Sequence, residues 1–159
     1  MANRIVAGFL VLLVGMMATV SYAAPHGQIV IFDKGQATYD TPENALNSFF
    51  SAYMAEDLEW HYQTLTEAAA AEKKADFERN QLDPMAELAI FRSGFVEGAI
   101  TETLDYLDAR VLVVRITDDI GDQFLLPYTL VMEGGEWKVT NKYSDAEALE
   151  PYSDFIPYQ

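Results

Sequence analysis

The sequence contains no cysteine. This absence excludes disulfides, thiol nucleophiles and zinc sites built on thiolates, so the fold must be held together by packing alone. Basic residues are also few, with 10 Lys and Arg against 25 Asp and Glu, which gives a formal net charge of −15 at pH 7. Binding to phosphates or to anionic lipid headgroups needs a positive face. We therefore expect neither nucleic acid nor an anionic membrane surface as a partner.

Glycine and proline are scarce as well, with 9 and 6 residues in a chain of 159. This composition excludes collagen-like and low-complexity chains. Apolar residues, in contrast, are plentiful: 50% of the chain is hydrophobic and 13% is aromatic. Such a chain can bury enough apolar surface to offset its conformational entropy, and its length fits one globular domain.

The N-terminal residues have the pattern of an export signal. A single base, Arg4, precedes an uncharged apolar run over residues 5–20, and Ser21, Tyr22 and Ala23 place small residues at the positions that a signal peptidase reads. We predict a signal peptide over residues 1–23 and an exported protein, periplasmic or secreted, that begins at Ala24. An uncleaved anchor is the alternative, but the run is shorter than the roughly 20 residues of a membrane span. No stable membrane anchor is expected after cleavage.

The first half of the remaining chain is predicted to be helical. Residues 24–40 contain one strand-like stretch, residues 28–32, and are expected to form an N-terminal arm or an edge strand. Good N-cap residues then mark four helix starts, two of them followed by proline. The third helix is strongly polar and is expected at the surface, and the fourth should end near Gly94. The predicted caps are Thr41, Asp57, Thr66 and Asp83.

From residue 99 onward the hydrophobic period changes from helical to alternating, which is typical of strands. We predict four strands, over residues 100–106, 109–117, 123–132 and 136–143. The turns between them are short, so neighbouring strands should be antiparallel. Helices followed by a meander indicate an α+β fold in which N-terminal helices pack on an antiparallel sheet. Residues 144–159 are predicted to be an acidic aromatic tail.

Several short segments resemble the NTF2-like superfamily, the cystatin-like cone. They are the first helix at residues 41–50, the segment 55–57 before the second helix, and the closing hairpin of residues 126–131 and 136–139. The resemblance covers residues 41–143 and is nearest to small exported domains of undefined activity. It implies helices packed on a strongly curved sheet, with a pocket between them. Enzymes of this superfamily use an inward carboxylate or histidine together with tyrosine or aspartic acid donors.

Strand alternation predicts which side chains face this pocket. On the last strand Trp137, Asn141 and Tyr143 share the inward face with Val139. On the preceding strand Tyr128 shares the expected core side with four bulky apolar residues, Phe124, Leu126, Leu130 and Met132. No carboxylate lies on either face. For the first two strands the pattern leaves open whether Glu102 or Asp105, and whether Arg110 or Arg115, points inward. The candidate ligand-binding residues are Tyr53, His61, Tyr128, Trp137, Asn141 and Tyr143.

Three functions are compatible with these residues. The leading expectation is a non-catalytic exported domain that binds a small apolar or amphipathic ligand, or an envelope protein. The first alternative is an isomerase or dehydratase in which His61, a residue type able to titrate near neutral pH, is the base and a tyrosine stabilises an oxyanion. The second is a structural homodimer formed through Leu125, Pro127 and Val131. No cofactor or metal is expected, because the aspartates of residues 118–122 lack the spacing of a calcium loop.

Overall fold

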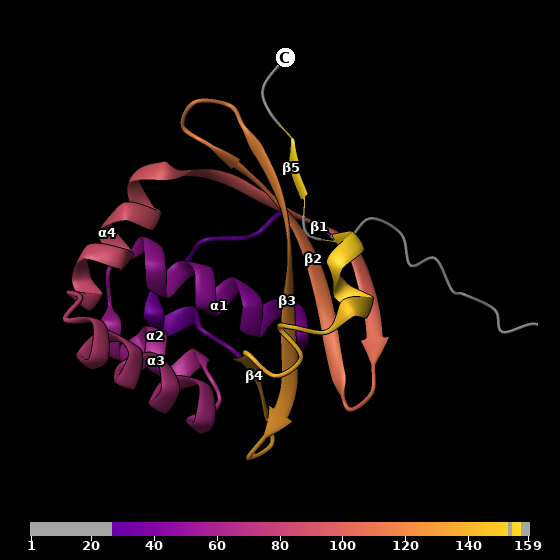
Figure 1. Cartoon of the computed structure of the whole chain (residues 1–159), viewed down its shortest axis with the longest axis horizontal. Coiled ribbons are helices and arrows are strands. Elements are labelled where there is room, and N and C mark those ends of the chain that lie inside the picture. The colour runs from indigo at the N-terminus through magenta and orange to yellow at the C-terminus, as the bar shows by residue number, and fades with distance from the viewer. Residues whose placement is uncertain (1–26, 153, 157–159) are drawn as a thin grey trace, which may run out of the picture.

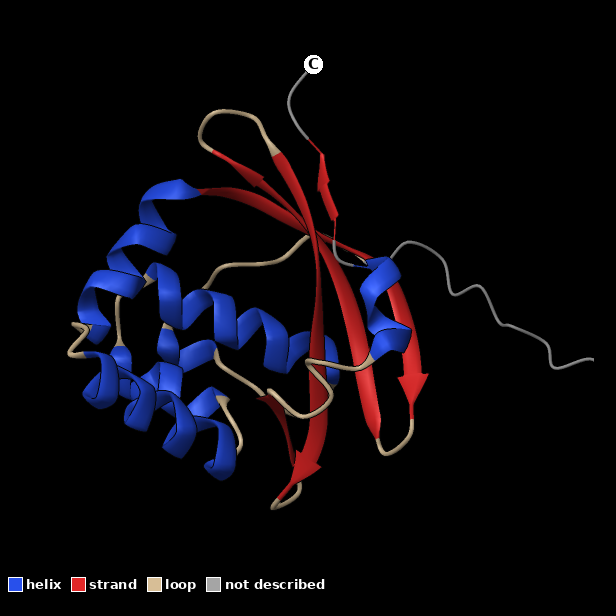
Figure 2. Cartoon of the chain, viewed as in Figure 1, coloured by secondary structure: helices blue, strands red, loops and turns tan. Residues whose placement is uncertain are grey.

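The computed structural model describes residues 27–152 and 154–156. The α-helices precede the sheet in the chain and lie together on one of its sides (Figure 1, Figure 2). The predicted α+β class is confirmed. The signal-peptide prediction, residues 1–23, lies outside the described residues. The helices are α1 (Pro42–Met54), α2 (Leu58–Thr64), α3 (Glu67–Asn80) and α4 (Pro84–Gly94), and the main strands are β1 (Phe95–Tyr106), β2 (Ala109–Asp118), β3 (Gln123–Glu133) and β4 (Glu136–Thr140).

All four helices begin at the predicted caps. Each cap side chain accepts a hydrogen bond from a backbone N–H of the first turn, which satisfies a donor that the helix itself leaves unpaired. The donor–acceptor distances are 3.1 Å at Thr41, 2.8 Å at Asp57, 3.2 Å at Thr66 and 2.9 Å at Asp83. None of the helices in the described part of the chain is long and apolar enough to cross a membrane.

The sheet is an antiparallel meander in the order β1-β2-β3-β4. α1 lies against the helix-facing side of this sheet (Figure 1). Its Leu46 and Phe50 are fully buried in one core cluster with Leu112 and Leu130 of the sheet. On β2 the helix-facing side is therefore the one that also carries Arg110, a choice that the alternation left open.

The C-terminal residues, predicted to be a tail, both cover the sheet and extend it. A short 3-10 helix, η2 (Glu147–Tyr152), contacts β3 on the side away from α1 to α4, with Leu149 only 4% exposed (Figure 2). Strand β5 (Asp154–Ile156) then pairs with the first residues of β3. The chain therefore covers part of its own outer sheet face. Leu125, Pro127 and Val131 on that face are half-buried.

Strand boundaries differ from the prediction at three places. Residues 28–32 do not form a strand, because their pairing with the sheet is limited to one isolated bridge between Gln28 and Ala99. A short 3-10 helix, η1 (Lys34–Gln36), follows them. β1 begins at Phe95, directly after α4, and not at residue 100. β4 ends at Thr140 and not at Tyr143, because the chain turns there and Ser144 N donates to Asn141 O at 3.0 Å.

Sheet residues near the ends of the strands are also more exposed than the alternation predicted. Leu126 and Met132, expected on the core side, are 38% and 53% exposed. On β1 the register shifts between Ile100 and Glu102, so a simple two-residue period cannot be followed through this strand. Neither Glu102 nor Asp105 is buried.

Candidate functional site

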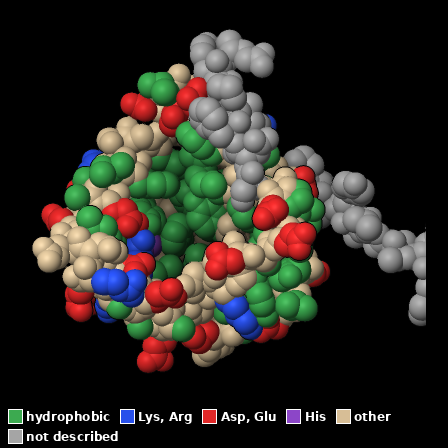
Figure 3. Space-filling model, in the orientation of Figure 1, with side chains coloured by type: hydrophobic (Ala, Val, Ile, Leu, Met, Phe, Trp, Pro, Cys, Tyr) green, Lys and Arg blue, Asp and Glu red, His purple; other side chains and the backbone are tan. Residues whose placement is uncertain are grey.

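A cavity of about 280 Å³ lies between the helices and the sheet. Figure 3 shows the hollow, with hydrophobic side chains covering its interior and charged side chains at its edge. Pockets of this size with an apolar lining and a few polar groups are typical ligand sites. The apolar lining comes from α1, the C-cap of α2, α3 and strands β3 and β4, through Phe49, Tyr53, Leu65, Ala69, Tyr128 and Val139.

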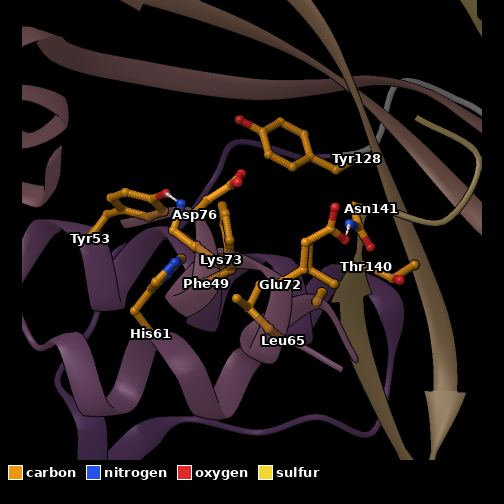
Figure 4. A pocket seen from close by; sticks show the side chains of 12 residues that line it. Phe49, Tyr53, His61, Leu65, Glu72, Lys73, Asp76, Tyr128, Thr140 and Asn141 are labelled. Atoms are coloured by element: carbon orange, nitrogen blue, oxygen red, sulfur yellow. Dashed lines mark hydrogen bonds between the residues drawn. The ribbon is translucent and has the colours of Figure 1, made fainter. Parts of the chain in front are cut away.

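Phe49 lies at the centre of the aromatic floor, which we define as Phe49, Tyr53 and Tyr128. Its ring centroid is 5.1 Å from that of Tyr53 and 5.7 Å from that of Tyr128, both in edge-to-face geometry. Such ring pairs hold one another in defined positions. The hydroxyl of Tyr128 points into the cavity (Figure 4), and burial raises the pKa of this phenol. The floor is therefore uncharged.

His61 lies against this floor. Asp57 caps α2 and the adjacent Trp60 anchors it, since Trp60 is buried and its indole Nε1 donates to Tyr39 Oη at 3.0 Å. The imidazole of His61 points toward the cavity (Figure 4), with its ring centroid 4.4 Å from that of Tyr53. It is 0% exposed, and neither ring nitrogen has a hydrogen-bond partner among the described residues.

The electrostatic surroundings keep His61 neutral. Burial lowers the pKa of the imidazole to about 4, and the ammonium of Lys73 acts in the same direction. At neutral pH one ring nitrogen is then a donor and the other an acceptor. Leaving such groups unpaired in the interior is costly, so they call for an explanation.

A polar network connects three helices beside the floor. Glu87 Oε1 accepts hydrogen bonds from Tyr53 Oη at 2.8 Å and from Lys73 Nζ at 2.6 Å. Lys73 Nζ also lies 3.5 Å from Tyr53 Oη (Figure 4). Burial acts to raise the pKa of Glu87, but the hydrogen bonds from Lys73 and Tyr53 outweigh it and hold the pKa below its usual value. Burial and the neighbouring Glu87 raise the pKa of Tyr53.

Polar side chains surround the entrance, and we call Glu72, Lys73, Asp76 and Asn141 the rim. Asn141 Nδ2 donates a hydrogen bond to Glu72 Oε2, which links the end of β4 to α3 (Figure 4). Asp76 lies within 2.8 Å of Arg79 Nη1, one turn further along the same helix. The carboxylates of Glu72 and Asp76 are therefore not paired with Lys73, the cation of the rim, which binds Glu87.

Four of the six predicted ligand-binding residues converge on the cavity: Tyr53, His61, Tyr128 and Asn141. Trp137 does not line it, but packs at the edge of the core, and its backbone N donates to Tyr39 O at 2.9 Å. Tyr143 lies elsewhere, because β4 ends before it and its φ is 69°. Its hydroxyl donates to Asp108 Oδ1 at 2.6 Å.

The prediction missed the contribution of α3 and α4. Glu72, Lys73 and Asp76 were expected on a polar surface helix, and Glu87 of the fourth helix was not predicted to have a role. The available signal was the spacing of Ala69, Glu72, Lys73 and Asp76, which places them on one face of a helix. A small residue among charged ones on that face indicates close approach to another element. Neither arginine of β2 lines the cavity, and Arg110 Nε lies 2.7 Å from Asp105 Oδ1.

The site is not arranged as a histidine–carboxylate pair. A general base is normally oriented by a third group that hydrogen-bonds to its other nitrogen. No carboxylate of the described residues reaches either nitrogen of His61. Residues 27–152 and 154–156 also hold no group of three His, Asp or Glu side chains that could bind a metal ion.

Comparisons with models of protein families, with curated proteins and with solved structures found no match to this chain. No relative therefore assigns a ligand or a reaction to the cavity. The interpretation of the site depends on its own geometry and charge.

Proposed function

We propose that this chain is a non-catalytic binding domain that holds a small, largely apolar molecule in the cavity between its helices and its sheet. The observation that carries the proposal is His61, which is fully buried beside an apolar cavity and has no hydrogen-bond partner among the described residues. An unpaired buried polar group costs about 1–3 kcal/mol. A ligand with a hydrogen-bonding group supplies the missing partner and recovers part of that cost.

Entry of a ligand requires a small displacement of the wall above His61, because both nitrogens are closed off from solvent. α3 is the element suited to this movement. Only Ala69 and Phe77 of its side chains are buried, and polar contacts hold much of the helix in place, including the hydrogen bond of Asn141 to Glu72. Polar contacts near solvent exchange readily with water, so this wall opens at lower cost than one built on apolar packing.

The proposal includes the NTF2-like cone and export through a signal peptide over residues 1–23. Support for the cone comes from the order of the elements, four helices and then an antiparallel meander, with a cavity between the two layers. A protein ligand is less well supported, since the apolar lining is concave. The isomerase or dehydratase alternative has weaker support, because His61 lacks an orienting group and its low pKa makes it a poor base.

A pair of matched variants tests binding in the cavity. Ala69 lines the cavity and is buried, whereas the adjacent Ala68 on the same helix is exposed. Ala69→Phe should fill the cavity and Ala68→Phe should leave it open. We expect medium-chain alcohols, amines and cyclic ketones that raise the Tm of the wild type to raise that of Ala68→Phe equally, but not that of Ala69→Phe. Equal stabilisation of both variants, or no stabilisation of the wild type by any compound, contradicts the proposal.

A further inference from the structure

We propose that the ligand is an amphipathic amine, whose ammonium group lies at Glu72 and Asp76 while its apolar body covers the aromatic floor. This inference rests on the proposed function, since it names the chemical class that the same cavity takes. It is carried by the distribution of charge around the cavity and by the buried His61.

The positive charge of the lining is already balanced. Lys73 is the cation among the residues that line the cavity, and its ammonium is held by Glu87 Oε1 at 2.6 Å and lies near Tyr53 Oη. A ligand carboxylate would have to displace Glu87 from this ammonium. An anionic ligand therefore gains no free cation at this site.

The negative charge of the rim is not balanced in the same way. Glu72 and Asp76 lie four residues apart on α3, so their carboxylates occupy the same face of the helix and both lie at the cavity (Figure 4). Glu72 accepts from the neutral amide of Asn141, which leaves its charge in place. Asp76 pairs with Arg79, but both side chains are more than half exposed, and such exposed pairs contribute little.

An ammonium group fits between these carboxylates for two reasons. Like charges four residues apart on a helix repel, and a cation between them relieves the repulsion. An ammonium also donates charge-assisted hydrogen bonds to carboxylates, the strong class of such bonds.

His61 provides the independent observation that points to a ligand and limits its chemistry. The imidazole is fully buried, points toward the cavity and lacks a hydrogen-bond partner among the described residues. Because burial and Lys73 keep it neutral, it offers no positive charge to an anionic group at the floor. It can instead pair with a neutral donor or acceptor on the body of the ligand.

Three probes with the same chain and different head groups test the inference: octylamine, octanol and octanoate. We expect octylamine to bind the wild type at pH 7 at least about tenfold more tightly than octanoate, with octanol between them, in isothermal titration calorimetry. The advantage of the amine should shrink at high salt, because ions screen the exposed carboxylates. Glu72→Gln and Asp76→Asn should each weaken octylamine about three- to tenfold and leave octanol unchanged.

Glu78→Gln is the matched control, since Glu78 is an exposed carboxylate of the same helix that does not line this cavity. It should leave the affinity for all three probes unchanged. Octanoate binding as tightly as octylamine, or Glu72→Gln and Asp76→Asn leaving octylamine unaffected, overturns the inference. If octanol still binds in that case and Ala69→Phe abolishes its binding, the proposed function stands. If none of the three probes binds the wild type, the inference and the proposed function are both wrong.

Discussion

Tyr53 donates its hydroxyl hydrogen to Glu87 Oε1 at 2.8 Å, although the two residues belong to α1 and α4. The ammonium of Lys73, from α3, reaches the same oxygen at 2.6 Å. One carboxylate oxygen thus connects three helices beside the cavity. The stability of that wall should therefore depend on Glu87 more than on an ordinary surface acid.

We expect Glu87→Gln to destabilise the fold by about 1 kcal/mol, because the neutral amide weakens two charge-assisted hydrogen bonds that are only partly exposed. Urea denaturation measures the change. Glu59→Gln, on an exposed glutamate of α2, is the control and should be neutral. In a double-mutant cycle, Tyr53→Phe and Glu87→Gln should show non-additive effects. Additive effects would mean that the Tyr53–Glu87 hydrogen bond contributes nothing to stability.

The buried His61 should make stability depend on pH. Burial lowers the pKa of its imidazole from 6.5 to about 4 in the folded state. Between these values the unfolded chain binds a proton that the folded chain does not, so stability falls as pH falls from 6.5 to 4. The loss should be on the order of 3 kcal/mol. The titratable groups that surround His61 are Tyr53, Tyr62, Lys73 and Glu87.

His61→Leu removes this titration, so the free energy of unfolding should change less between pH 6.5 and 4 than in the wild type. Urea titrations at a series of pH values measure the difference. Parallel pH profiles for the two proteins would show that the imidazole titrates normally in the folded state and is not buried as described.

Gly98 tests how the N-terminal segment packs on β1. A Cβ at this position would lie 2.9 Å from Ile29 Cγ1, closer than real contacts allow. Ile29 N also donates to Gly98 O at 2.8 Å. Gly98→Ala should therefore cost about 1–3 kcal/mol through overpacking, with increased hydrogen exchange at Ile29. Gly94→Ala, with nothing near its added methyl group, is the control and should be neutral or stabilising.

The expected homodimer remains a prediction. Because η2 packs on β3 on the outer side of the sheet, we expect association through Leu125, Pro127 and Val131 to be weak. Val131→Lys should then reduce the mass measured by light scattering at high protein concentration. Val96→Lys, on the exposed side of β1, is the control. A wild type that stays monomeric at every concentration would contradict this surface as an interface.

Local signals predicted the fold well, and long-range contacts explain what they missed. Capping and proline positions such as Thr41 with Pro42 act within a few residues, so the helix starts could be located from sequence. β4 ends at a turn after Asn141, and the alternation of apolar and polar residues gives no sign of this turn. Because of the turn, Tyr143 lies beside Asp108 and not at the cavity. The role of α3 was missed because its charged face was interpreted as a solvent face.

The candidate site was predicted in part for the same reason. Tyr53, His61 and Tyr128 lie on elements whose inward faces are marked by apolar neighbours. The regular spacing of apolar residues along the sequence therefore identifies them. Glu87 reaches the site only because α4 packs beside α1, at a sequence separation of 34 from its hydrogen-bond partner Tyr53. A single sequence carries no signal for such a contact.

The position of η2 and β5 at the end of the chain has a consequence for biosynthesis. Translation delivers the helices and the strands up to Thr140 first, and Leu149 emerges only afterwards. Until then Thr129 and the other residues on that side of β3 lack the layer that covers them in the finished protein. A chain that terminates just before residue 144 would therefore lack this layer permanently and leave that side of β3 uncovered.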